Sequence, residues 1–293
     1  MSGLALVLVL FAAAVHASWN LAATRVPGGA RFVFCYYTVS AVVLVPVGVA
    51  HLVVTGDRPR WAWLLAAAVT AVAHVAYGVV LQRGYAVGDL SVVYPLARGC
   101  GPLLSVLVAV AVLHERPGWP GFAGAVLVVG GVLVISAPRG PGDPGRRRAG
   151  AGYGVLTGVT IAAYTLWDAY AVGELGVPPV VYLAAGTVLQ SLMLAPYALR
   201  GGGRRGDAGG SPRALWREHR RAVLLVGLLS PVAYVLVLFA MRLAPVSLVA
   251  PLREVSIVLG GLAGWLLLGE PHGGRRLAGS AIVLAGITAI ALA

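Results

Sequence analysis

The chain has 293 residues, of which 59% are hydrophobic and only 11% are charged, and its mean hydropathy is +0.88. A soluble domain has about a quarter of its residues charged, so this composition excludes a water-soluble globular fold and predicts a polytopic helical membrane protein. The net charge of +12 comes from arginine alone. These arginines lie mostly in short linkers, as expected for membrane loops, so we expect no binding to nucleic acid.

Apolar runs long enough to cross a bilayer, about 20 residues, follow one another along nearly the whole chain. Hydropathy predicts ten transmembrane helices, at residues 3–23, 30–53, 61–82, 90–113, 119–137, 151–171, 179–199, 222–242, 246–268 and 276–292. The first run lacks the basic start of a signal peptide, so we interpret it as the first of these helices. An Arg/Gly/Pro-rich linker at 138–150 separates the fifth helix from the sixth. A second polar stretch, 200–221, includes a predicted surface helix over Pro212–Arg221.

The two halves of the chain resemble each other in the same order. Trp19-Asn20 of the first predicted helix aligns with Trp167-Asp168 of the sixth, and His16 aligns with Tyr164. The later matches are Ala76-Tyr77 with Ala233-Tyr234, Ser91–Leu96 with Ser247–Leu252, Glu115 with Glu270, Gly124 with Gly279 and Gly131 with Gly286. The chain is therefore predicted to consist of two repeats of a five-helix unit, at residues 1–137 and 151–293.

Five is an odd number, so the second unit must enter the membrane from the opposite side. Inverted repeats are typical of secondary transporters, whose substrate site lies near the membrane midplane between the repeats. We therefore expect an all-α polytopic membrane fold, with ten transmembrane helices arranged as two inverted five-helix repeats around a central cavity.

Three features resemble the EamA-type drug/metabolite transporter superfamily over essentially the whole chain. They are the phrase H-x-x-W-N at 16–20, the S…P…E pattern through the fourth and fifth helices, and the glycines of the fifth and tenth helices. The resemblance implies a ten-helix carrier with two EamA units, often an exporter of amino acids, small metabolites or drugs, driven by proton motive force or by exchange. It implies a multi-pass protein of the bacterial inner (plasma) membrane that needs no cofactor. Its partners would be the lipid bilayer and a small-molecule substrate.

Ionisable groups inside predicted helices are costly and usually face a cavity or a partner, and four of them stand out. They are Arg98, Asp168, Arg253 and Glu254. The alignment sets Arg98 opposite Glu254, so pseudo-symmetry places the two across one cavity. One interpretation is a substrate site, in which Arg98 or Arg253 binds a carboxylate or phosphate and Glu254 takes an amine or a proton. The other is a structural ion pair between the fourth and ninth helices, because buried pairs are retained for either reason.

Two aligned prolines, Pro95 and Pro251, each lie a few residues inside a predicted helix. Proline removes a backbone donor and kinks a helix, which frees an upstream carbonyl group that a ligand could use. Both prolines are therefore candidate hinges beside the cavity, although kinks in membrane helices also serve packing alone.

Asp168 is the best candidate for a proton carrier, together with Glu254. A carboxyl group in a low-dielectric site can load and release a proton near neutrality. The aligned residue, Asn20, cannot titrate, which makes the two halves inequivalent. The alternative is that Asp168 lies at the water boundary, because its predicted helix ends a few residues later.

Aromatic and polar residues complete the candidate substrate site. Tryptophan can stack on a ring or cover a cation, although near a helix end it is more often an interface anchor. Tyrosine and histidine would add polar edges to an apolar cavity, and each can also serve packing alone. Besides Arg98, Arg253 and Glu254, the candidates for substrate binding are His16, Trp19, Asn20, Tyr77, Tyr94, Trp167 and Tyr234, and the same reasoning names His74 and Tyr164.

Small residues on the fifth, ninth and tenth helices permit close helix approach, and a homodimer face is an alternative use for them. They are Gly124, Gly131, Gly260, Gly264, Gly279 and Gly286.

Cys35 and Cys100 have no metal-ligand spacing, so neither a disulfide framework nor a metal site is expected. The chain has no HExxH, GxSxG or Walker-type motif, so we do not expect an enzyme. An integral membrane enzyme with an intramembrane polar site is the alternative.

Two arguments disagree about orientation. Carriers of the superfamily that the chain resembles usually keep both termini in the cytoplasm. Most arginines, including Arg146–Arg148 and the seven within Arg200–Arg221, lie on the side opposite the termini, so the arginine bias favours termini outside.

The arginines near the cavity favour an anionic or zwitterionic solute, such as an amino acid or an organophosphate, whereas the apolar surroundings also suit a small lipophilic drug.

Overall fold

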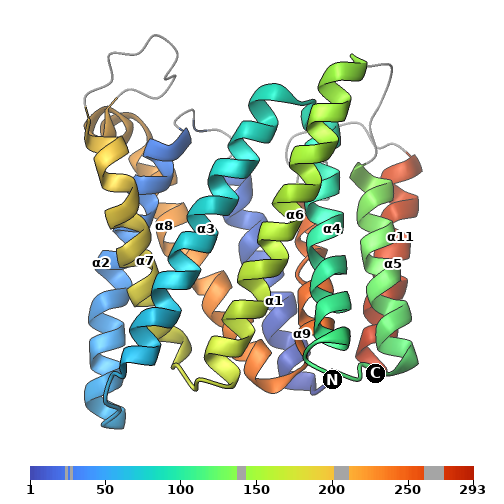
Figure 1. Cartoon of the computed structure of the whole chain (residues 1–293), viewed down its shortest axis with the longest axis horizontal. Helices are drawn as coiled ribbons and strands as arrows, with labels where there is room; N and C mark the ends of the chain where they lie inside the picture. Colours follow the sequence, from blue (N-terminus) through green and yellow to red (C-terminus); the bar gives the residue numbers. More distant parts are fainter. Residues whose placement is uncertain (24–25, 27–28, 137–142, 201–210, 261–273) are drawn as a thin grey trace.

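The computed structural model describes residues 1–23, 26, 29–136, 143–200, 211–260 and 274–293. Within these ranges the fold is all-α, as predicted, and Figure 1 shows the helices side by side in one bundle. The helices are α1 (Gly3–Ala23), α2 (Gly29–Thr55), α3 (Trp61–Val87), α4 (Leu90–Ala111), α5 (Gly118–Ser136), α6 (Pro144–Gly173), α7 (Pro179–Leu199), α8 (Pro212–Leu243), α9 (Val246–Leu252) and α11 (Gly274–Ala291). Residues 255–260 are also helical.

Eight of the described helices, α1 to α8, are long and apolar enough to cross a membrane. Helix α11 contains a shorter apolar stretch, Leu277–Ala291. The predicted ninth helix, 246–268, is not continuous, because α9 ends at Leu252 and helical structure resumes at residue 255. Residues 261–268 of that prediction lie outside the described residues.

Two helices begin earlier than hydropathy predicts, because side chains cap their first turns. The Asp143 carboxylate accepts a hydrogen bond from the Arg146 amide at 2.8 Å, and Pro144 follows the cap. At the start of α8, the Ser211 hydroxyl oxygen accepts a hydrogen bond from the Ala214 amide at 3.2 Å. Such caps stabilise the first turn of a helix, so α6 includes residues 144–150 of the predicted linker. Residues 138–142 of that linker lie outside the described part of the chain.

The predicted surface helix over Pro212–Arg221 forms as the first part of α8. The backbone leaves helical geometry at His219, where φ is −122° and ψ is 24°. This break lies within the arginine-rich start of α8, after Arg217 and before Arg220 and Arg221. The polar segment can therefore follow the membrane surface at an angle to the spanning segment.

The two five-helix units are inverted, as Figure 1 shows. Helix α1 rises from the lower edge, where both termini lie, whereas its counterpart α6 descends from the upper edge. The packing follows the same pseudo-twofold relation: α1 packs on α8 as α6 packs on α3, and α2 packs on its own counterpart α7.

Polar contacts tie the two units together at both edges of the bundle. On the terminus side, the Glu115 carboxylate accepts hydrogen bonds from the amides of Val246 and Ser247, each at 2.9 Å. These are first-turn donors of α9, which have no partner within the helix. On the opposite side, Arg146 pairs with Asp89 at 3.1 Å and donates to the Gly88 carbonyl at 2.9 Å.

The largest buried apolar cluster lies toward the terminus side and takes side chains from both units. Its members include Val9 of α1, Val172 of α6, Tyr182 of α7, Leu238 of α8 and Leu248 of α9. Val9, Val172 and Leu238 belong to the terminus-side halves of their helices. The bundle is therefore closely packed below its centre.

Helices α5 and α11 meet through the four aligned glycines. A Cβ atom at Gly131 would lie 2.7 Å from the carbonyl oxygen of Gly279, and one at Gly286 would lie 2.7 Å from that of Gly124. The prediction of close helix approach is confirmed for these residues. The homodimer alternative is wrong for them, because an intramolecular contact already covers their faces. Gly264 lies outside the described residues.

The glycine contact predicts opposite effects for two adjacent alanine substitutions. Gly131→Ala should lower the free energy of unfolding by about 1–3 kcal/mol, because the new methyl group would overlap backbone atoms. Gly130→Ala should raise it by about 0.5–1 kcal/mol, because a Cβ there meets no atom within 4 Å and alanine favours the helix. Unfolding of the two purified variants in detergent checks this, and equal stabilities would contradict the packing.

Candidate functional site

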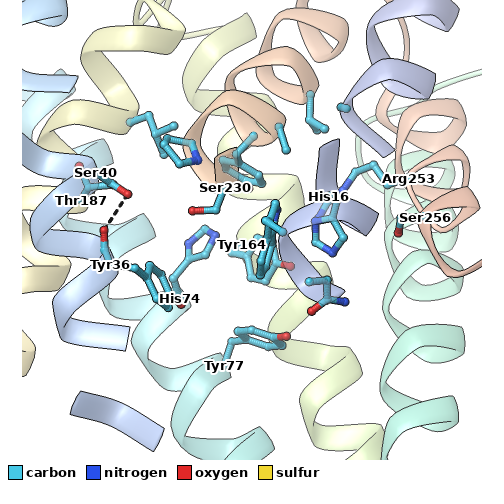
Figure 2. Close-up of a pocket in the computed structure, with 18 of the residues that line it drawn as sticks. His16, Tyr36, Ser40, His74, Tyr77, Tyr164, Thr187, Ser230, Arg253 and Ser256 are labelled. Carbon is cyan, nitrogen blue, oxygen red and sulfur yellow. Dashed lines mark hydrogen bonds between the residues drawn. The ribbon is translucent and has the colours of Figure 1, made fainter. Parts of the chain in front are cut away.

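A cavity of about 210 Å³ lies between the two units, at the middle of the bundle. Figure 2 shows its side chains converging from both units. The described lining residues are Ala12, Ala13, His16, Trp19, Asn20, Tyr36, Tyr37, Ser40, His74, Tyr77, Arg98, Tyr164, Leu183, Thr187, Gln190, Ser230, Pro231, Ala233, Tyr234, Val237, Arg253, Glu254 and Ser256. Trp19 and Asn20 lie in the last turns of α1, so the cavity extends from the centre toward the side opposite the termini.

An ion pair between the two units lies in the wall of this cavity. Nη1 of Arg98, on α4, is 3.6 Å from Oε1 of Glu254, and the two side chains are only 15% and 4% exposed. Nη2 of Arg98 also lies 3.5 Å from Nε2 of His16 on α1. The structure thus brings together the two charges that the repeat alignment sets opposite each other.

The chain breaks its helix where the second arginine enters the cavity. Arg253 and Glu254 follow α9 outside regular helix, and the Glu254 amide donates to the Pro251 carbonyl at 3.0 Å. In a regular helix, consecutive side chains point about 100° apart, whereas both of these side chains line the cavity. The hinge predicted at Pro251 therefore coincides with an interruption, whereas α4 is helical through Pro95.

Aromatic rings form the rest of the wall. The His74 ring stacks on Tyr164, with centroids 4.1 Å apart, and meets the edge of Tyr234 at 5.5 Å. The Arg253 guanidinium lies 5.6 Å from the Tyr234 ring centroid. His16 packs edge-on against Trp19 at 4.6 Å. The charges therefore stand beside π-faces, which stabilise cations and bind planar groups.

Three cavity-lining residues carry a buried polar atom that has no hydrogen-bond partner among the described residues. These atoms are Nε1 of Trp19, Oε1 of Gln190 and Oε2 of Glu254. A buried polar group without a partner costs about 1–3 kcal/mol. The cavity therefore presents one donor and two acceptors that a polar molecule bound there would satisfy.

Three of the predicted site residues are not among the lining residues. Trp167 donates from Nε1 to the Ala66 carbonyl at 3.0 Å, which is a packing contact between α6 and α3. Tyr94 lies under the Arg98 guanidinium, with its ring centroid 5.7 Å away. Asp168 is fully buried and bonded to two tyrosines, so the water-boundary alternative for this residue is wrong.

The sequence analysis missed the part of the lining that comes from α2, α7 and the later helices. These residues are Tyr36, Tyr37, Ser40, Thr187, Gln190, Ser230 and Ser256. The signal was present, because Tyr36 and Ser40 are four residues apart and Thr187 and Gln190 three apart, so each pair shares a helix face. Polar residues on one face of an apolar helix indicate the side that faces the protein interior.

Comparison with known proteins agrees with the architecture. Residues 3–137 and 148–292 each match the model of the EamA-like transporter family. A solved structure described only as "Crystal structure of protein" is similar in fold, with a TM-score of 0.77 and 18% sequence identity over 100% of this chain and 98% of that one. No curated protein matched the chain.

The buried ion pair predicts a large and specific stability effect. Glu254→Gln should lower the free energy of unfolding by about 3–5 kcal/mol, because it leaves buried arginines without a carboxylate. Adding Arg98→Met should restore part of the loss. The matched control is Asp89→Asn at the more exposed pair with Arg146, which should cost about 0–1 kcal/mol. Denaturant unfolding in detergent measures all three, and equal losses at the two pairs would contradict the burial argument.

Proposed function

Because the chain belongs to the EamA-like transporter family, we propose that it is a secondary active transporter that exports a small zwitterionic or anionic metabolite by alternating access. Family membership implies a metabolite or drug transporter rather than an enzyme. The finer assignment, to a solute class and a binding site, rests on the geometry of the central cavity.

The observation that carries the proposal is the convergence of two arginines and one glutamate on one cavity between inverted repeats. Arg98 and Arg253 bring two positive charges, and Glu254 brings one negative charge. Guanidinium groups bind carboxylates and phosphates through strong charge-assisted hydrogen bonds. A substrate anion therefore has a partner in Arg98 or Arg253, and the cavity charge stays positive until the anion arrives.

The free oxygen of Glu254 extends the argument to a substrate amine. Oε1 of Glu254 faces Arg98, whereas Oε2 has no partner among the described residues. A substrate ammonium group would satisfy Oε2, and Oε1 of Gln190 offers a second acceptor. An anion and an amine on one molecule, as in an amino acid, would match both halves of this charge pattern.

The size of the cavity favours a metabolite over a drug. Pockets that hold drug-sized ligands measure about 300–1,000 Å³, whereas this cavity measures about 210 Å³. The rings of His74, Tyr164 and Tyr234 would contact the apolar part of such a solute.

Alternating access follows from the inverted repeats. Transporters of this architecture move one repeat against the other around a central site. In this structure the large apolar cluster packs both units together on the terminus side, while the cavity extends toward the other side. Rocking would have to separate that cluster and the contact of Glu115 with α9, and close the opposite side around Trp19 and Asn20 at the end of α1.

Metabolite profiling in a bacterial host tests the proposal. Wild type should raise the external level of one class of amino acid or organophosphate, measured by mass spectrometry in medium and cells. Arg98→Ala and Glu254→Gln should each reduce this export at least about tenfold, because a hydrogen bond to a charged group contributes about 1.5–3 kcal/mol.

Two further variants separate binding from folding. Gln190→Met should reduce export without loss of protein, because Oε1 of Gln190 has no partner in the described chain to lose. Arg242→Ala, at an exposed position near the end of α8, should export like wild type. If no metabolite class changes although wild type inserts well, export of a host metabolite is excluded. If Arg98→Ala exports normally, the substrate site is elsewhere.

A further inference from the structure

Asp168 is a buried carboxylate that lies outside the central cavity and is held by two phenols. None of its surface is accessible. Oδ1 accepts a hydrogen bond from the Tyr182 hydroxyl at 2.6 Å, and Oδ2 accepts one from the Tyr234 hydroxyl. Within the described residues, no arginine or histidine forms an ion pair with it. The mechanism proposed above leaves this group without a role.

The two tyrosines connect Asp168 to two separate cavities. Tyr234 lines the central cavity. Tyr182 lines a second pocket of about 300 Å³, formed by the start of α3 and the start of α7 on the terminus side. Trp61, at 85% exposure, marks the outer end of that pocket, whereas Tyr182 is only 1% exposed. Asp168 and its phenols therefore form the partition between the substrate cavity and a pocket that reaches the terminus face.

The charged and titratable groups around this partition are few. His74 approaches from α3, where its ring meets the edge of Tyr234, and Arg253 lies on the other side of that ring. Tyr164 precedes Asp168 by one turn on α6 itself and stacks on His74. On α4 the cation is Arg98, which pairs with Glu254 and not with Asp168. Apart from Asp168, the groups that touch its carboxylate are therefore neutral phenols.

We propose that Asp168 is the proton-binding residue of the carrier, loaded from the terminus-side pocket through Tyr182 and discharged toward the substrate cavity through Tyr234. The proposal rests on the proposed transport function and adds its coupling ion. A lone carboxylate inside a membrane protein is costly as an anion. Proton uptake neutralises it in place, and among the described residues no cation inside ion-pair distance holds it in the charged form.

The proton moves without any other change in bonding. Tyr182 passes its hydroxyl proton to Oδ1 of Asp168 and takes a replacement from water in the terminus-side pocket. For discharge, the Tyr234 hydroxyl, which donates to Oδ2 in this structure, turns toward the central cavity and releases its proton there. The neutral acid turns its own proton toward Tyr234 and gives it to the phenolate oxygen. Both phenols end as they began, and one proton has crossed the partition.

The repeat explains why only one side has such a route. In the first unit Asn20 aligns with Asp168 and Tyr77 aligns with Tyr234, and both line the central cavity. Because the asparagine amide cannot titrate, the pseudo-symmetric position cannot carry a proton. Of the aligned pair Asn20 and Asp168, Asp168 is the residue that can bind a proton. This restricts proton access to the terminus side, as directional transport requires.

Infrared difference spectroscopy of the full chain in proteoliposomes tests the proposal without knowing the substrate. On acidification, wild type should gain the carbonyl stretch of a protonated carboxylic acid. Asp168→Asn should lose this band, whereas the double variant Arg98→Met with Glu254→Gln, which removes the other described buried carboxylate together with its partner, should keep it. Asparagine keeps a hydrogen-bonding side chain of the same size, so the variant should fold. If the band persists in Asp168→Asn, or if wild type shows none, Asp168 only joins the helices and the proposal is wrong.

Tyr182→Phe supplies a second readout in a chain that keeps its aspartate. Loss of one phenol donor should shift the frequency of the Asp168 band, and a band unchanged in frequency would contradict the hydrogen-bonded route.

In the export assay, Asp168→Asn should still equilibrate the solute but lose its accumulation against a gradient, and a protonophore should impose that loss on wild type. A wild-type gradient that survives the protonophore would overturn proton coupling. An infrared result of either sign stands even if no exported solute is found, so failure of the coupling and failure of the transport function are distinguishable.

Discussion

The free-energy cost of a charged side chain in the hydrocarbon core of a bilayer is the main constraint on this structure. A bilayer core cannot solvate a guanidinium or a carboxylate, so such groups must face a partner or a cavity. Arg98 and Glu254 meet this requirement in each other, across the boundary between the two repeats. Their pairing fixes α4 against the segment after α9, and the aromatic walls of the cavity assemble around that junction. The same charges that join the two repeats therefore line the central cavity.

The two units share one helix arrangement in inverted orientation, and they differ in the side chains at several aligned positions. The units share a five-helix plan, yet an arginine in one stands where a glutamate stands in the other, and an asparagine where an aspartate stands. Helix α4 is continuous, whereas its counterpart is interrupted at Arg253 and Glu254. Equal frames therefore carry unequal side chains, and the two units line the central cavity with different chemical groups.

Close packing of backbones joins the two units along their helices. The aligned glycines bring the backbones of α5 and α11 into contact, and α6 does the same against α4, where a Cβ at Gly154 would lie 3.0 Å from the Val93 carbonyl oxygen. Without a hydrophobic force between helices in lipid, such contacts are a main source of association. Both pairs join a helix of one unit to a helix of the other, so these contacts hold the two units together alongside the polar links.

The sequence by itself determined the membrane class, the approximate helix ends, the duplication and the facing of Arg98 and Glu254, because hydropathy and repeat alignment depend only on order along the chain. Inversion followed from the odd number of helices. It did not determine the break after α9, the two phenols on Asp168 or the cap of Glu115 on α9. These depend on how each helix is rotated about its axis, and helices that are apolar on every face carry little periodic signal to specify that rotation. Only the tertiary structure decided them, because contacts between different helices, such as Tyr234 with Asp168 and Val246 with Glu115, fix which face of each helix turns inward.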